Sequence, residues 1–188
     1  MGVESNHYPE TIRERSIAAL YGAAWVPVSY VFQRVSLDAG AYMGWTTLEK
    51  IHQAFAGCHF TKQVTGSQVF IGAVAGIAFA PIEEFLFRVG VQNILLRDKA
   101  VEWFPGLAPF VDTLAGKSAR IFLSSLGFAL AHFGNGKPLD EAKLQVLNAF
   151  GLGLTAGFLQ ERTKNPYASI GLHMAWNGIA AWISWRKC

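Results

Sequence analysis

The stretch SQVFIGAVAGIAFAPIEEFLFRVGVQNILL, residues 67–96, decides how this chain folds. Its only charged side chains are Glu83, Glu84 and Arg88. As an α-helix the stretch is about 45 Å long, which exceeds the roughly 30 Å hydrocarbon thickness of a bilayer. Acidic side chains at membrane depth cost several kcal/mol, so they face a cavity or a partner and commonly have a function. The stretch therefore predicts a membrane helix that carries a functional acidic pair.

The rest of the chain has the same apolar character. Of its 188 residues, 52% are hydrophobic and only 15% are charged. Residues 16–33, 144–160 and 166–185 carry no charge, and residues 119–133 contain only Arg120. A span needs about 20 apolar residues, with a range of roughly 17 to 25, and a soluble core of this size would have to bury all these runs. We therefore expect an all-α, polytopic transmembrane helix bundle with helices at 16–33, 67–96, 119–133, 144–160 and 166–185.

The chain divides into two parts at the start of the long apolar stretch. Residues 1–66 are expected to hold one membrane helix and an interfacial loop at 37–65, and residues 67–188 form the membrane core. The net charge of +3 is spread along the chain without a basic stripe, which favours the lipid bilayer as a partner and argues against nucleic acid. Which membrane holds the protein, and in which orientation, stays open.

The acidic pair has a cation at helical spacing. Glu84 and Arg88 are four residues apart and share one helix face, so they can form an ion pair. Glu83 lies about 100° further around the helix. Two adjacent carboxylates are difficult to keep ionised together in a low dielectric unless a cation holds one of them. Glu83 is then available as a general base near neutral pH, although a pair that only fixes helix packing would have the same spacing.

Two further apolar helices carry polar groups at the same spacing. Phe128 and His132 share a face of the helix at 119–133, and His173 and Asn177 share a face of the last helix. A lone histidine in an apolar helix is more often a hydrogen-bonded core residue than a catalytic group. Several such costly groups on separate apolar helices are better explained by a common site.

The ordered set of motifs resembles the signature of the CPBP intramembrane protease family. That family includes the CAAX prenyl endopeptidases and the bacteriocin-processing or immunity proteins of Abi type. The residues that carry the resemblance are Glu83-Glu84-x-x-x-Arg88, Phe128-x-x-x-His132 and His173-x-x-x-Asn177. The resemblance covers about residues 67–185. It implies a helix bundle around a water-accessible cavity, and an endopeptidase that acts on a peptide or protein substrate, either a prenylated CAAX protein or a leader peptide.

The resemblance also implies a role for each residue. Glu83 would activate the attacking water as general base, and His132 would help to hold that water. His173 and Asn177 would stabilise the oxyanion of the tetrahedral intermediate, a task suited to donors that are aimed in advance at the developing charge. The supporting residues would be Glu84, Arg88 and Phe128.

Two questions stay open at this level. Glu83, His132 and His173 form a metalloprotease-like set that could bind zinc with a water in the fourth position. We expect the metal-free route, because Asn177 beside His173 fits an oxyanion site better than a zinc shell. The alternatives to an enzyme are a non-proteolytic immunity or scaffold protein that keeps the protease fold, and a small transporter that uses the carboxylates as a proton relay.

Overall fold

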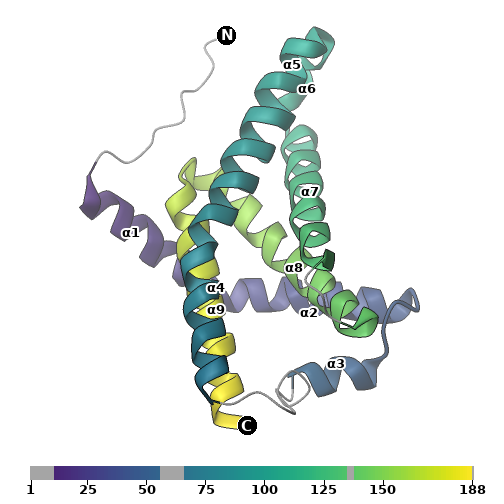
Figure 1. Ribbon diagram of the computed structural model, residues 1–188. Helices are drawn as coiled ribbons and strands as arrows, with labels where there is room; N and C mark the ends of the chain where they lie inside the picture. The colour runs from purple at the N-terminus through teal and green to yellow at the C-terminus, as the bar shows by residue number, and fades with distance from the viewer. Residues whose placement is uncertain (1–10, 56–65, 135–137, 188) are drawn as a thin grey trace.

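The computed structural model describes residues 11–55, 66–134 and 138–187, and all regular elements in these residues are helices (Figure 1). The all-α prediction is therefore confirmed. The α-helices are α1 (Ile12–Ala23), α2 (Val26–Tyr42), α3 (Leu48–Phe55), α4 (Gly66–Glu84), α5 (Ala100–Trp103), α6 (Ala108–Val111), α7 (Leu114–Ala131), α8 (Leu139–Thr163) and α9 (Pro166–Lys187). A π-helix, η1 (Phe85–Lys99), joins α4 to α5, and the short 3₁₀ helices are η2 (Pro105–Leu107) and η3 (His132–Gly134).

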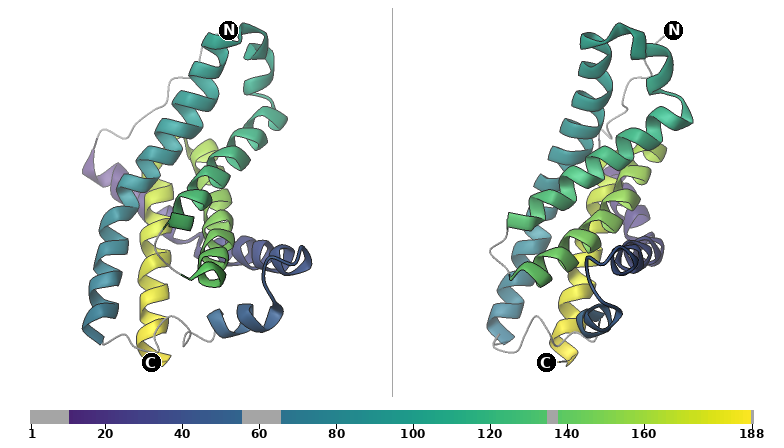
Figure 2. Two further views of the ribbon diagram at one scale, coloured as in Figure 1. Left: turned by 45° about the vertical axis from the view of Figure 1, so that its right-hand side comes forward. Right: turned by 90° about the vertical axis from the view of Figure 1, so that its right-hand side faces the viewer.

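The prediction of one continuous helix over residues 16–33 is wrong. α1 ends at Ala23 and α2 begins at Val26, so the run is divided into helices of 12 and 17 residues, the second of which continues to Tyr42. Pro27 explains the break, because proline has no N–H to donate to the Ala23 carbonyl but is tolerated in the first turn of a new helix. α2 lies across the direction of α4 and α9 (Figures 1 and 2).

The interfacial stretch predicted at 37–65 is only partly described. It contains the end of α2 and the short helix α3, while residues 56–65 lie outside the described part of the chain, as do residues 1–10. The division of the chain at residue 66 stays a prediction.

The helix predicted at 67–96 is confirmed and is longer than expected. α4, η1 and α5 follow one another without a break, and Figure 2 shows them as one rod beside α9. The helix continues through Pro81 and changes from α to π hydrogen bonding directly after Glu84. Within the described residues, one helix, Phe70–Trp103, is long and apolar enough to cross a membrane, and only 11% of its most apolar window is buried.

The three remaining predicted helices are confirmed as α7, α8 and α9. Their bounds differ from the predicted ones: α7 begins at Leu114 and ends at Ala131, so that His132 and Phe133 lie in η3, and α8 extends beyond the predicted run at both ends. α8 packs against α2, α7 and α9, and α4 packs along α9. The buried apolar cluster between them comprises Phe128, Ala129, Val146, Ala149, Leu152, Ala156, Leu159 and Leu172.

The N-terminal helix α1 packs against α9 through close backbone contact. A Cβ atom on Gly22 would overlap the carbonyl oxygen of Ala168, and one on Gly171 would overlap that of Ala19. The crossing therefore requires glycine on both helices, as in close helix contacts of membrane proteins. Gly171 is two residues before His173, so α1 supports the part of α9 that carries a candidate site residue.

Candidate active site

The predicted ion pair between Glu84 and Arg88 is confirmed. Arg88 Nε lies 3.0 Å from Glu84 Oε2, and both side chains are fully buried. A second guanidinium nitrogen, Nη1, donates to the hydroxyl of Ser124 on α7 at 3.0 Å. The pair thus places two opposite charges away from lipid and solvent and joins the long helix to α7.

His173 lies between the two adjacent glutamates. Its Nδ1 is 3.0 Å from Glu84 Oε1, and its Nε2 is 3.6 Å from Glu83 Oε2. Because the carboxylate of Glu84 is paired with Arg88, it accepts the hydrogen bond, so Nδ1 carries the hydrogen. This arrangement fixes the orientation of the ring and turns Nε2 toward Glu83.

The two glutamates occupy different environments. The Glu84 side chain has no exposed surface, whereas 36% of the Glu83 side chain is exposed. The difference follows from helix geometry, because consecutive residues point about 100° apart. Of the two carboxylates, only that of Glu83 can therefore meet a molecule that approaches from outside the bundle.

Phe128 brings both histidines and the arginine to one buried ring. The ring centroid of Phe128 lies 4.6 Å from that of His132 and 5.6 Å from that of His173. The guanidinium carbon of Arg88 lies 5.5 Å from the same centroid. His132 Nδ1 donates to the backbone carbonyl of Phe128 at 2.8 Å, which leaves Nε2 as the nitrogen that can accept a hydrogen bond when the ring is neutral.

Asn177 is hydrogen-bonded to the backbone of α4. Its amide Nδ2 donates to the backbone carbonyl of Gly76 on α4 at 2.9 Å. Gly76 precedes Glu83 by about two helical turns. The structure therefore brings Glu83, Glu84, Arg88, Phe128, His132 and His173 into one connected set, with Asn177 at its edge.

The alternative zinc set was Glu83, His132 and His173. Among the residues that the structure describes, no group of three or more His, Cys, Asp or Glu side chains is arranged to hold a metal ion.

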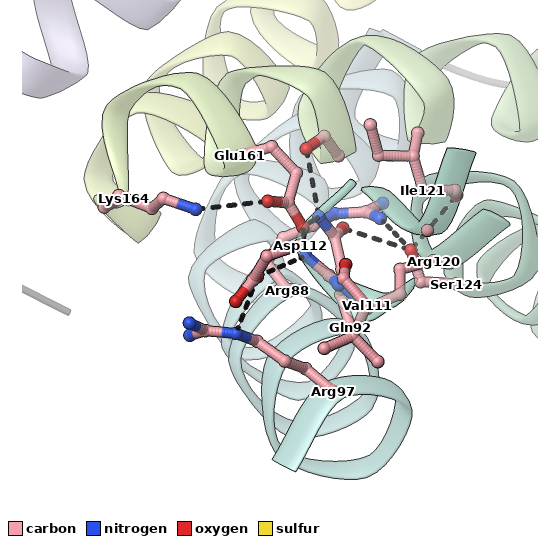
Figure 3. Close-up of polar contacts among 12 residues, drawn as sticks. Arg88, Gln92, Arg97, Val111, Asp112, Arg120, Ile121, Ser124, Glu161 and Lys164 are labelled. Atoms are coloured by element: carbon pink, nitrogen blue, oxygen red, sulfur yellow. Dashed lines mark hydrogen bonds and ion pairs between the residues drawn. The ribbon is translucent and has the colours of Figure 1, made fainter. Parts of the chain in front are cut away.

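A polar network that was not expected from the sequence extends from Arg88 (Figure 3). Ser124 donates to Gln92 Oε1 at 3.1 Å, and Gln92 Nε2 donates to Glu161 Oε1 at 3.1 Å. Glu161 is paired with Arg120 at 2.9 Å. Helical spacing could have indicated two of its members. Gln92 follows Arg88 by four residues and Ser124 precedes Phe128 by four residues, so each shares a helix face with a predicted site residue.

The geometry can now be compared with known proteins. Residues 65–179 match the family model described as type II CAAX prenyl endopeptidase Rce1-like, and this range contains all the candidate site residues. Neither a curated protein nor a solved structure matches the chain.

The match covers more than half of the chain, so the class is that of CAAX-type intramembrane proteases. This chain belongs to the type II CAAX prenyl endopeptidase Rce1-like family, which confirms the resemblance seen in the sequence. The family is membrane-embedded, and within the described residues one helix is long and apolar enough to cross a membrane.

Proposed function

We propose that this protein is a multi-pass intramembrane endopeptidase in which Glu83 activates water for attack on a peptide carbonyl. The observation that carries the proposal is the division of labour between the two glutamates around His173. Glu84 is buried and paired with Arg88, while the partly exposed Glu83 lies 3.6 Å from His173 Nε2. That separation is slightly longer than a direct hydrogen bond, so Nε2 and the Glu83 carboxylate lie close enough to contact the same water molecule on their exposed side.

In the proposed reaction Glu83 takes a proton from water as the water oxygen bonds to the carbonyl carbon. The carbonyl oxygen becomes an oxyanion, which Asn177 stabilises by donating a hydrogen bond from its amide. His173 donates to the same oxygen through Nε2, and for this it acts as an imidazolium with a hydrogen on Nε2 as well as on Nδ1. For this step Asn177 uses the amide hydrogen that is not bonded to Gly76, or it exchanges partners. Glu83 then returns the proton to the leaving nitrogen as the C–N bond breaks, which yields a carboxyl and an amine terminus.

The remaining residues act on this centre indirectly. His132 holds the water through Nε2, because its Nδ1 is already bonded to Phe128. Phe128 packs against both imidazole rings, and Arg88 keeps Glu84 in place as acceptor for His173. We propose that the route is metal-free and that the substrate is a peptide or protein, either a prenylated CAAX protein or a leader peptide.

The test is a cleavage assay with purified protein in lipid, offered a farnesylated CAAX peptide and the same peptide without the prenyl group. Glu83→Gln and His173→Ala should each abolish cleavage while membrane insertion is kept. Glu102→Gln is the matched control, because Glu102 lies further along the same continuous rod and its carboxylate is exposed and paired with Lys99.

The roles of the two residues are refuted if either variant keeps full activity. A chelator should leave the wild-type rate unchanged, and a loss of activity that zinc restores would replace the metal-free route. A different result would favour the non-proteolytic immunity or scaffold function. In that case the wild type cleaves neither peptide, and both variants still support the cellular phenotype.

A further inference from the structure

Beyond its ion pair with Glu84, Arg88 makes one other side-chain hydrogen bond within the described residues, to Ser124. Its Nε is bonded to Glu84 and its Nη1 to Ser124, while Nη2 has no hydrogen-bond partner in the described part of the chain. All of these groups are buried. Removing the Ser124 hydroxyl would therefore leave the guanidinium with its hydrogen bond to Glu84 and its contact with the Phe128 ring, and no hydrogen bond would fix its far side.

Ser124 is itself hydrogen-bonded to Gln92, which follows Arg88 by one helical turn. Its oxygen accepts from Arg88, so its hydrogen is available to Gln92 Oε1 at 3.1 Å or to the Ile121 carbonyl at 3.2 Å. The Gln92 amide nitrogen donates to the Gly157 carbonyl and to Glu161, each at 3.1 Å. Both of these partners are acceptors, so the amide nitrogen faces them and the amide oxygen faces Ser124.

The far end of this chain of hydrogen bonds is anchored by a second buried ion pair. The Glu161 and Arg120 side chains are only 7% and 4% exposed, and Arg120 also donates to the Val111 carbonyl. Gly157 allows the close approach, because a Cβ atom there would lie 3.0 Å from Gln92 Oε1. Gly157 and Glu161 together fix the Gln92 amide nitrogen, so its amide oxygen lies where the Ser124 hydroxyl can donate to it, and Ser124 in turn accepts from Arg88.

We propose that Ser124 and Gln92 are positioning residues that hold Arg88, and through it Glu84, so that His173 presents Nε2 to Glu83. The proposal rests on the proposed function, because it assigns Ser124 and Gln92 to the same catalytic centre. Neither residue touches the reacting atoms. Their loss is expected to disturb the orientation of His173 while the binding of substrate is kept.

Ser124→Ala tests this role, and Ser125→Ala is the matched control. Both serines are buried on α7, but among the residues that the structure describes the Ser125 hydroxyl bonds only to the Ile121 carbonyl of its own helix, at 2.6 Å. Ser124→Ala should lower kcat on the order of tenfold, the effect of one lost hydrogen bond to a charged group, with KM unchanged. Gln92→Met should lower kcat in the same direction, and the double variant should be no worse than the stronger single variant, because the two act in series.

A readout that does not depend on cleavage separates this proposal from the proposed function. Nitrogen-15 NMR of the histidine side chains in lipid should show a protonated, hydrogen-bonded Nδ1 on His173 in the wild type and in Ser125→Ala. In Ser124→Ala that signal should shift or broaden, and Ser124→Thr, which keeps the hydroxyl, should restore it together with kcat. The proposal is overturned if Ser124→Ala matches Ser125→Ala in both kcat and the His173 signal, even when the wild type is an active protease. If the wild type does not cleave either peptide but the His173 signal still shifts in Ser124→Ala, the positioning role stands and only the proposed function is refuted.

Discussion

Replacing Arg88 with methionine removes the cation from the buried pair while it keeps the length and apolar stem of the side chain. The Glu84 carboxylate would then be fully buried without its charge partner. Breaking a buried pair by removing one partner costs about 3–5 kcal/mol, because the remaining charge is left uncompensated. Such a loss is a large part of the roughly 5–15 kcal/mol by which proteins of this kind are stable.

The second half of the prediction concerns the double variant Glu84→Gln with Arg88→Met. Glutamine keeps an oxygen that can accept from His173 Nδ1, which lies 3.0 Å away, but it carries no charge. Since neither buried charge remains, the double variant should be more stable than Arg88→Met by about 2 kcal/mol or more. The single variant Glu84→Gln should also be destabilised, because it leaves Arg88 as an uncompensated buried cation.

The measurement is reversible unfolding in mixed detergent micelles, followed by the fluorescence of the six tryptophans. The four proteins form a double-mutant cycle, and the coupling free energy is the quantity of interest. Lys99→Met serves as the control, because it breaks an exposed pair with Glu102 on the same rod and should cost at most about 1 kcal/mol. Additive effects of the two substitutions, with the double variant less stable than either single variant, would refute the buried, mutually dependent pair.

Two further predictions concern packing and surface charge. Gly171→Ala should lower the unfolding midpoint, because its Cβ would overlap the Ala19 carbonyl. Gly178→Ala on the same helix is the control, since a Cβ there has ordinary space and the change should be neutral or stabilising. Equal effects of the two substitutions would contradict the close crossing of α1 and α9. Lys50→Ala should change the midpoint little at neutral pH, because its partner Asp140 is exposed. The hydrogen bond and charge of Lys50 lower the pKa of Asp140. Any small loss of stability in Lys50→Ala should therefore be present at neutral pH and disappear as the pH falls through that pKa. A loss of stability that grows on acidification would contradict this assignment.

Helix spacing alone predicted part of the site. Glu84 and Arg88 are four residues apart on one helix, so their contact needs no knowledge of the tertiary fold. The positions of Phe128, His132 and His173 relative to that pair depend on how three helices pack. Those positions were expected from the order of the motifs in the family resemblance rather than from the physics of any single segment.

The network beyond Arg88 could not be predicted in the same way. Ser124 meets Gln92 only because α7 and η1 face one another in a particular register, and serine and glutamine are common in apolar helices without such a role. The prediction of one helix over residues 16–33 was wrong for a different reason, because a local signal lies within the run itself. Pro27 was visible in the sequence, but the uncharged run 16–33 was assigned by its composition, and the missing N–H of proline overrode that pattern.

The placement of His173 restricts how a proton can move in the proposed reaction. Its Nδ1 hydrogen is bonded to Glu84, whose other oxygen is bonded to Arg88, so moving that hydrogen would disturb a buried ion pair. Nε2 has no such constraint and faces the partly exposed Glu83. In the proposed reaction His173 can therefore exchange a proton, or form a new hydrogen bond, only through Nε2, which lies on the side of the partly exposed Glu83. Of the two adjacent carboxylates, Glu84 thus fixes the histidine, and in the proposed reaction Glu83 is the one that acts on water.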